Sequence, residues 1–313
     1  MEALMNIDGA GATLPALLYA KWADNYQKQT GNRVNYQGLG SSGGVSQIVA
    51  KAVDFACTDV PLSLDKLHSD GLEQFPAVIG AVTPVVNIPG IGPGQLRLTP
   101  EVLADIYLSR IRKWNDPAIA ELNPGLSLPA TDICVVRRAD GSGTTWLFTQ
   151  YLAARSKEWV QKLGSGATVI WPSGLGGKSN EGVAAFVREL AGAIGYVAVP
   201  YAATNHLADV LLENRSGAFV APTTAALTAA TQGVTLMPGG ELTPSLLDRD
   251  AADAWPIAGA SLVLTSSDRA AGVHAFFDWA FHHGAQDCAD LGYVPLPTAV
   301  ATALTDGWNG ASK

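Results

Sequence analysis

Cysteine, charged residues and long apolar runs are all scarce in this sequence of 313 residues. Its three cysteines, Cys57, Cys134 and Cys288, are far apart and have no CxxC spacing, which excludes a disulfide framework or a zinc ribbon as the organising device. No run of about 18 apolar residues occurs, so no segment is expected to span a membrane. Charged residues make up 15% of the chain and the net charge is −8, which argues against a nucleic-acid partner.

The first six residues lack a basic region followed by an apolar core, so we expect no signal peptide. The chain is then either cytosolic or the mature form of an exported protein. With 48% hydrophobic residues it can form substantial cores, and its length suits two globular domains. We expect no metal site, because His282 and His283 are adjacent and would point to different faces of a helix.

Residues 133–152 predict a buried strand, a glycine-rich turn and the start of a helix. The turn contains Arg138, Ser142 and Thr144, whose side chains are hydrogen-bond donors suited to a compact oxyanion. A helix N-terminus adds backbone N–H groups and a partial positive charge. The alternative is an ordinary helix cap, with Asp140 or Ser142 as the capping residue.

The first 61 residues predict an alternation of strands and helices, which is typical of a mainly parallel sheet. A helix is expected over 16–30 and a second over 45–52, with strands over 34–37 and around 53–59. Thr13, Ser41 and Asp59 each lie in a turn at a strand or loop end, where binding groups of such sheets gather.

The rest of the chain shows the same mixture of elements, with a candidate domain crossing in the apolar run 81–89. Periodicity predicts helices over 100–108, 117–122, 181–190, 225–233, 270–282 and 297–308, and strands over 193–198 and 260–265.

Ser41 lies in the sequence GSSGG (40–44), which matches the nucleophile elbow of serine hydrolases. A hydrolase would also need a later aspartate and histidine, and His206, His274, His282 and His283 are available. None of these histidines has distinctive neighbours. An anion-binding hydroxyl at a helix N-terminus explains Ser41 with fewer assumptions, and the esterase or phosphatase remains the alternative.

Asp59 decides which anion such a pocket would accept. An ionised carboxylate only accepts hydrogen bonds, so it is favourable only if the ligand still has a proton to donate. Phosphate near neutral pH keeps at least one proton and sulfate keeps none. A site with many donors and one carboxylate therefore favours phosphate over sulfate, by up to about 10⁴–10⁵ when a buried polar group is left unpaired.

Four stretches together resemble the periplasmic phosphate-binding proteins of bacterial phosphate ABC transporters: 9–13 (GAGAT), 36–44 (YQGLGSSGG), 58–61 (TDVP) and 137–144 (RRADGSGT). Further similar stretches cover nearly the whole chain in the same order: 75–80, 105–108, 175–178, 192–197 and 276–280. The region from about 205 to 240 departs most.

The resemblance implies an α/β, two-lobed, periplasmic-binding-protein-like (type II) fold, in which each lobe is a mostly parallel sheet flanked by helices. Two hinge strands would join the lobes, which would close around one phosphate. The implied bounds are 1–86 and 259–313 for lobe I and 87–258 for lobe II.

By position, the resemblance also implies the ligands of the phosphate ion. Hydroxyl donors would be Thr13, Ser41, Ser142 and Thr144, and backbone N–H donors would be Leu14, Ser41, Gly143 and Thr144. Arg138 would pair with the anion and be oriented by Asp140, while Asp59 would accept the phosphate proton. Leu14 stands where a phenylalanine is usual, which changes packing rather than the backbone contact.

The implied protein is not an enzyme and has no catalytic residues or cofactor. It would be a periplasmic monomer that delivers phosphate to the transmembrane permease subunits of the transporter.

Overall fold

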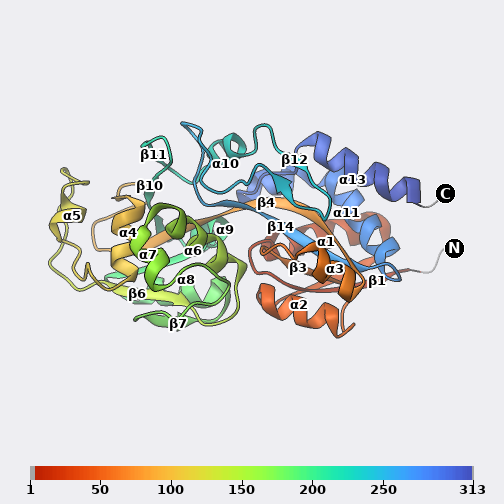
Figure 1. Cartoon of the computed structure of the whole chain (residues 1–313), viewed down its shortest axis with the longest axis horizontal. Coiled ribbons are helices and arrows are strands. Elements are labelled where there is room, and N and C mark those ends of the chain that lie inside the picture. The colour runs from red at the N-terminus through yellow and green to blue at the C-terminus, as the bar shows by residue number, and fades with distance from the viewer. Residues whose placement is uncertain (1–3, 312–313) are drawn as a thin grey trace. The chain divides into compact units, whose positions relative to one another are not determined.

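A computed structural model describes residues 4–311, and the chain divides into two units, each of which contains β-strands and helices (Figure 1). Unit 1 contains the described residues up to Gly80, Thr231–Leu246 and those from Gly259 onward, and unit 2 contains Ala81–Ala230 and Leu247–Ala258. The expected α/β class and periplasmic-binding-protein-like fold are confirmed. Among residues 4–311, no helix is both long and apolar enough to cross a bilayer.

The strands of unit 1 follow the order β2-β1-β3-β14, in which β1 is parallel to β2 and β3, and β14 (Ala258–Ser266) is antiparallel to β3. Its elements are β1 (Asn6–Gly11), α1 (Ala16–Thr30), β2 (Arg33–Gly38), α2 (Ser41–Val49), β3 (Phe55–Thr58), α3 (Leu64–Asp70), β12 (Thr235–Leu236), β13 (Leu242–Thr243), α11 (Ala270–His283), α12 (Ala285–Leu291) and α13 (Thr298–Ala311).

The strands of unit 2 follow the order β4-β8-β6-β7, in which β6 is parallel to β7 and β8, and β4 (Leu72–Asn87) is antiparallel to β8. A small sheet of β5, β10 and β11 also belongs to it. The elements are β5 (Arg97–Leu98), α4 (Pro100–Tyr107), α5 (Pro117–Ala120), β6 (Cys134–Arg138), α6 (Gly143–Arg155), α7 (Lys157–Lys162), β7 (Leu175–Gly177), α8 (Ser179–Glu189), β8 (Ala193–Ala198), α9 (Val199–Thr204), β9 (Ala208–Asp209), β10 (Leu211–Glu213), β11 (Phe219–Val220) and α10 (Thr224–Ala230).

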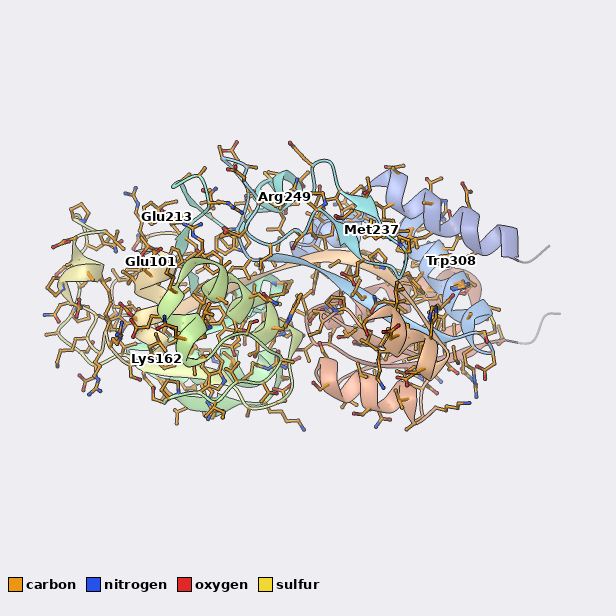
Figure 2. The ribbon with its side chains drawn as sticks, in the orientation of Figure 1. Glu101, Lys162, Glu213, Met237, Arg249 and Trp308 are labelled. Carbon is orange, nitrogen blue, oxygen red and sulfur yellow. The ribbon has the colours of Figure 1, made fainter. Side chains whose placement is uncertain are left out.

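The unit boundaries differ in two places from the lobe bounds predicted from the sequence. The strands β4 (Leu72–Asn87) and β14 (Ala258–Ser266) each contain a boundary, and in β4 it follows Gly80 rather than residue 86. Residues 231–246, placed by the sequence in lobe II, belong to unit 1. Their hairpin, whose connection includes Met237 (Figure 2), is anchored by Gln74 Nε2, which donates to the Gly239 carbonyl at 2.7 Å. The predicted lobe assignment itself stays a prediction.

The helix α1 confirms the prediction from periodicity. Its buried side chains Leu18, Tyr19, Trp22 and Tyr26 recur at helical spacing, and Gly31 ends the helix in the left-handed conformation with φ 82°. The helix α2, by contrast, starts at Ser41, four residues earlier than expected. The sequence predicts that GSSGG precedes this helix, but the segment packs closely on β1 and forms the first helical turn despite the low helix propensity of glycine.

Aromatic side chains form much of the core of each unit. In unit 1, Tyr36 stacks on Phe55 at a ring distance of 5.8 Å. In unit 2, Phe148 stacks on Tyr196 at 4.2 Å and 8°. The Phe55 and Phe148 side chains are fully buried, and complete burial of a phenylalanine stabilises its unit by about 1.5–3 kcal/mol.

Candidate functional site

The predicted site residues fall into two sets, one in each unit. In unit 1, Thr13, Ser41 and Asp59 follow the carboxyl ends of the parallel strands β1, β2 and β3. Carboxyl ends of neighbouring parallel strands meet at one edge of a sheet. Each of the three residues is only 2% exposed, so this edge holds three buried polar side chains.

Two glycines allow the backbone segments at this edge to approach closely. Gly11 has φ 139°, and a Cβ atom there would lie 2.1 Å from the Cys57 carbonyl oxygen. A Cβ on Gly44, in the first turn of α2, would lie 2.6 Å from the Gly11 Cα. The N–H groups of Leu39 and Gly40 both donate to the Gly11 carbonyl at 2.9 Å. The start of α2 is therefore held directly against the end of β1.

Ser41 is the first residue of α2, where a helix presents unpaired N–H groups and partial positive charge. Its Oγ accepts a hydrogen bond from the Asp59 N–H at 3.2 Å. This bond uses a lone pair of Oγ and leaves the hydroxyl proton of Ser41 for a different acceptor. The Ser41 side chain is thereby held next to the Asp59 backbone.

Asp59 is oriented by a residue that the sequence did not single out. The Ser261 hydroxyl, on β14, donates to Asp59 Oδ1 at 2.7 Å. The two residues are 202 positions apart, and no local pattern relates them. Only the antiparallel pairing of β14 with β3 brings them together.

Thr13 and Leu14 are held by packing as well as by hydrogen bonds. The Thr13 methyl group faces Gly38, where a Cβ atom would come within 2.9 Å of it, so the hydroxyl points in another direction. The Leu14 side chain is fully buried, and its carbonyl accepts from the Tyr293 hydroxyl at 2.5 Å. The backbone of both residues is therefore fixed in place.

The second set lies in unit 2, where β6 ends at Arg138 and α6 begins at Gly143. Ser142 is the N-cap of α6, and its Oγ accepts from the Thr145 N–H at 3.1 Å. The capping alternative from the sequence is thus a fact of the structure. It leaves the Ser142 hydroxyl proton for another acceptor, so capping and anion binding are compatible. Ser142 and Thr144 are both 1% exposed.

Arg138 and Asp140 form a two-nitrogen ion pair. Arg138 Nε donates to Asp140 Oδ1 at 2.8 Å, and Nη2 donates to Oδ2 at 2.5 Å. The Arg138 side chain is 1% exposed. The Ser179 N–H, at the start of α8, donates to Asp140 Oδ1 at 3.1 Å. This pairing fixes the plane of the guanidinium, as expected for an arginine that recognises an oxyanion.

The pair affects the titration of Asp140. Burial by itself raises the pKa of this carboxyl, but the hydrogen bonds and charge of Arg138, with the Ser179 N–H, outweigh burial and lower the pKa below its ordinary value of 3.8. A carboxyl whose pKa is lowered by folding adds stability above its unfolded-state pKa, and that stability is lost as the pH falls through the folded-state value.

We therefore expect the free energy of unfolding of the wild type to fall more steeply below about pH 4 than that of Asp140→Asn. Urea unfolding followed by circular dichroism at a series of pH values measures this difference. Asp132→Asn is the control, because that carboxylate is 84% exposed in the same unit and should leave the steepness unchanged. Equal steepness in the wild type and Asp140→Asn would contradict the prediction.

Tyr196 supports the same loop and was not assigned a role from the sequence. The Arg138 N–H donates to its hydroxyl oxygen at 3.2 Å, and Thr145 Oγ1 lies 2.8 Å from the same oxygen. Burial raises the pKa of Tyr196 to about 12, so it stays protonated and can donate to Thr145. Its place in β8 next to β6 explains the contact, which sequence spacing does not reveal.

In chemical terms, the set in unit 1 offers two hydroxyls and the carboxylate of Asp59, and the set in unit 2 offers hydroxyls, a helix N-terminus and one arginine. Among residues 4–311, no group of three or more histidine, cysteine, aspartate or glutamate side chains could hold a metal ion. Three of the four histidines considered for a hydrolase make other contacts: His274 pairs with Glu73, and the rings of His282 and His283 bond to carbonyls of their own helix.

Comparison with known proteins agrees with this combination of fold and donors. The model of the PBP superfamily domain matches residues 2–283. Phosphate-binding protein PstS of Haemophilus influenzae is 45% identical, covering 98% of this chain and 94% of its own length. The protein of the same name from Pasteurella multocida is 47% identical, covering 98% and 91%.

Solved structures have the same fold. A high-affinity periplasmic phosphate-binding protein, PfluDING, bound with phosphate, superposes with a TM-score of 0.75 at 22% identity, covering 96% of this chain and 93% of that one. A phosphate-binding protein from Stenotrophomonas maltophilia gives 0.69 at 20% identity, with the same coverage.

The fold and the matched domain thus show that the chain is a member of the PBP superfamily. At the identities just given, the chain belongs, within that superfamily, to the family of PstS phosphate-binding proteins. The serine hydrolase alternative is not supported, because these relatives are binding proteins. The resemblance stated from the sequence motifs is confirmed.

Proposed function

We propose that this chain binds inorganic phosphate and delivers it to the membrane permease of a phosphate ABC transporter, without catalysing a reaction. One observation carries the proposal: the Asp59 carboxylate is buried beside Ser41 and Thr13 at a strand edge that otherwise offers donors. Such a carboxylate favours an anion that still carries a proton. The names of the PstS relatives support the same ligand.

In this proposal each unit contributes one set of phosphate ligands. Unit 1 supplies the hydroxyls of Thr13 and Ser41, the N–H groups of Leu14 and Ser41, and Asp59 as acceptor of the phosphate proton. Unit 2 supplies the Arg138 guanidinium, oriented by Asp140, together with Ser142, Gly143 and Thr144. No cofactor takes part, and the protein acts as a monomer in the periplasm.

Equilibrium titration of the ligand-stripped protein with phosphate and with sulfate tests the proposal. We expect phosphate to bind at least about 10⁴-fold more tightly, because sulfate leaves the buried Asp59 carboxylate repelled and without a proton to accept. Arsenate, which keeps a proton at neutral pH as phosphate does, is a competitor that should bind. Comparable affinities for phosphate and sulfate would refute the proposal.

A separate assay tests the absence of catalysis. The wild type and Ser41→Ala are incubated with a chromogenic phosphate ester and a chromogenic carboxylic ester. We expect no turnover from either protein. Turnover by the wild type that Ser41→Ala abolishes would instead establish Ser41 as a nucleophile.

A further inference from the structure

Ser261 and Asp59 form a buried contact inside unit 1. In the pairing of β14 with β3, Leu262 lies opposite Thr58, and the same register places Ser261 opposite Asp59. Residues opposite each other on antiparallel strands have side chains on the same face of the sheet. The Ser261 side chain is fully buried, and its Oγ lies 2.7 Å from Asp59 Oδ1.

Two further polar side chains extend the hydrogen-bonded contacts of Ser261 into the core of unit 1. Cys57 Sγ lies 3.1 Å from Ser261 Oγ, and the Tyr19 hydroxyl lies 3.4 Å from the same sulfur. Cys57 and Tyr19 are both fully buried, and Cys57 is a free thiol. We call Tyr19, Cys57 and Ser261 the buried donor series.

The ionised carboxylate of Asp59 determines the direction of every hydrogen bond in this series. A carboxylate only accepts, so the Ser261 hydroxyl must donate to it. Ser261 Oγ can then accept from the Cys57 thiol, and the sulfur can accept from the Tyr19 hydroxyl. Burial, and after it the charge of Asp59, raises the pKa of Cys57 to about 12, so the thiol keeps the proton that it donates.

We infer that Ser261, supported by Cys57 and Tyr19, is the positioning residue that makes Asp59 selective for a protonated anion. The inference rests on the proposed function, in which Asp59 accepts the phosphate proton. By donating to Oδ1, Ser261 stabilises the ionised carboxylate and fixes its rotation. Oδ2 is thereby kept in one orientation as the oxygen that receives the ligand proton.

A double-mutant cycle tests this coupling. Phosphate affinity is measured for the wild type, Ser261→Ala, Asp59→Asn and the double variant. In the presence of Asp59, loss of a hydrogen bond to a buried charge should weaken phosphate binding about tenfold or more. In the Asp59→Asn background, where that charge is absent, the same Ser261→Ala change should alter affinity by less than about threefold.

Matched variants separate positioning from a structural effect. Thr265→Val removes another fully buried hydroxyl from β14, one that donates to the Asp54 carbonyl at 2.8 Å, and should leave phosphate affinity unchanged. Ser261→Thr keeps the hydroxyl and should recover most of the affinity lost in Ser261→Ala. If Ser261→Ala does not fold by circular dichroism, Cys57→Ala replaces it in the cycle. It should weaken phosphate binding about threefold in the presence of Asp59 and leave the affinity unchanged in the Asp59→Asn background, and Cys57→Ser is its rescue.

The outcomes distinguish the inference from the proposed function. A wild type that does not bind phosphate would overturn both. The inference alone would be overturned if the wild type binds phosphate but Ser261→Ala lowers the phosphate affinity equally in the wild-type and Asp59→Asn backgrounds. A loss confined to proteins that keep Asp59 would establish it.

Discussion

Asp59→Asn is expected to narrow the difference between the phosphate and sulfate affinities by about 10³-fold, mainly through tighter sulfate binding. The substitution removes the negative charge that repels a fully deprotonated anion. It also introduces an amide NH₂ group, which can donate to an oxyanion where the carboxylate could only accept.

The phosphate affinity of Asp59→Asn should be only about tenfold below that of the wild type, because phosphate can turn an unprotonated oxygen toward the new amide donor. Isothermal titration of the ligand-stripped variant with both anions measures the two changes. Asp54→Asn is the control, since it removes one negative charge from the same unit at a carboxylate paired with Arg269. If Asp59→Asn keeps the wild-type discrimination against sulfate, Asp59 is not the selecting group.

Arg138→Met is expected to weaken phosphate binding by about 10²–10³-fold. The guanidinium is buried and held by two hydrogen bonds to Asp140. Hydrogen bonds to charged groups contribute about 1.5–3 kcal/mol each, and about 1.4 kcal/mol corresponds to a tenfold change in affinity. The variant also leaves Asp140 without its cation, so the melting temperature should fall.

The two effects of Arg138→Met can be separated. Adding Asp140→Asn removes the uncompensated carboxylate, and this should recover part of the melting temperature but none of the phosphate affinity. Arg137→Met is the matched control, because neighbouring residues on a strand point to opposite faces and Arg137 donates to the Arg138 carbonyl rather than to Asp140. If Arg137→Met lowers the phosphate affinity by the same factor, the overall positive charge of this segment, and not the hydrogen bonds of the Arg138 guanidinium, attracts the anion.

Residues near one another in the sequence could be placed from local patterns. The apolar spacing of α1 and the glycine after it predict the bounds Ala16–Thr30, and the strand, turn and helix around Arg138 follow from residues 133–152. The capping role of Ser142 also follows, since an N-cap bonds within its own first turn. These features depend on interactions over a few residues, which periodicity and turn chemistry record directly.

Contacts between distant segments could not be placed in this way. The Ser261 hydroxyl reaches Asp59 because β14 pairs with β3, and Tyr196 reaches Arg138 because β8 pairs with β6. Residues 231–246 belong to unit 1 through contacts such as that of Gln74 with Gly239. A strand can be matched with several partners of similar hydrophobicity, so sequence patterns leave the choice of neighbour open.

The order of residues along the chain was therefore enough to specify the class of ligand chemistry: donors in glycine-rich turns, one arginine and one carboxylate. How that carboxylate is held depends on the folded unit, because Ser261, Cys57 and Tyr19 come from β14, β3 and α1. Side-chain type is a local property of the chain. The orientation of a buried side chain depends on which strands and helices pack around it, and that packing is settled only when the whole unit folds.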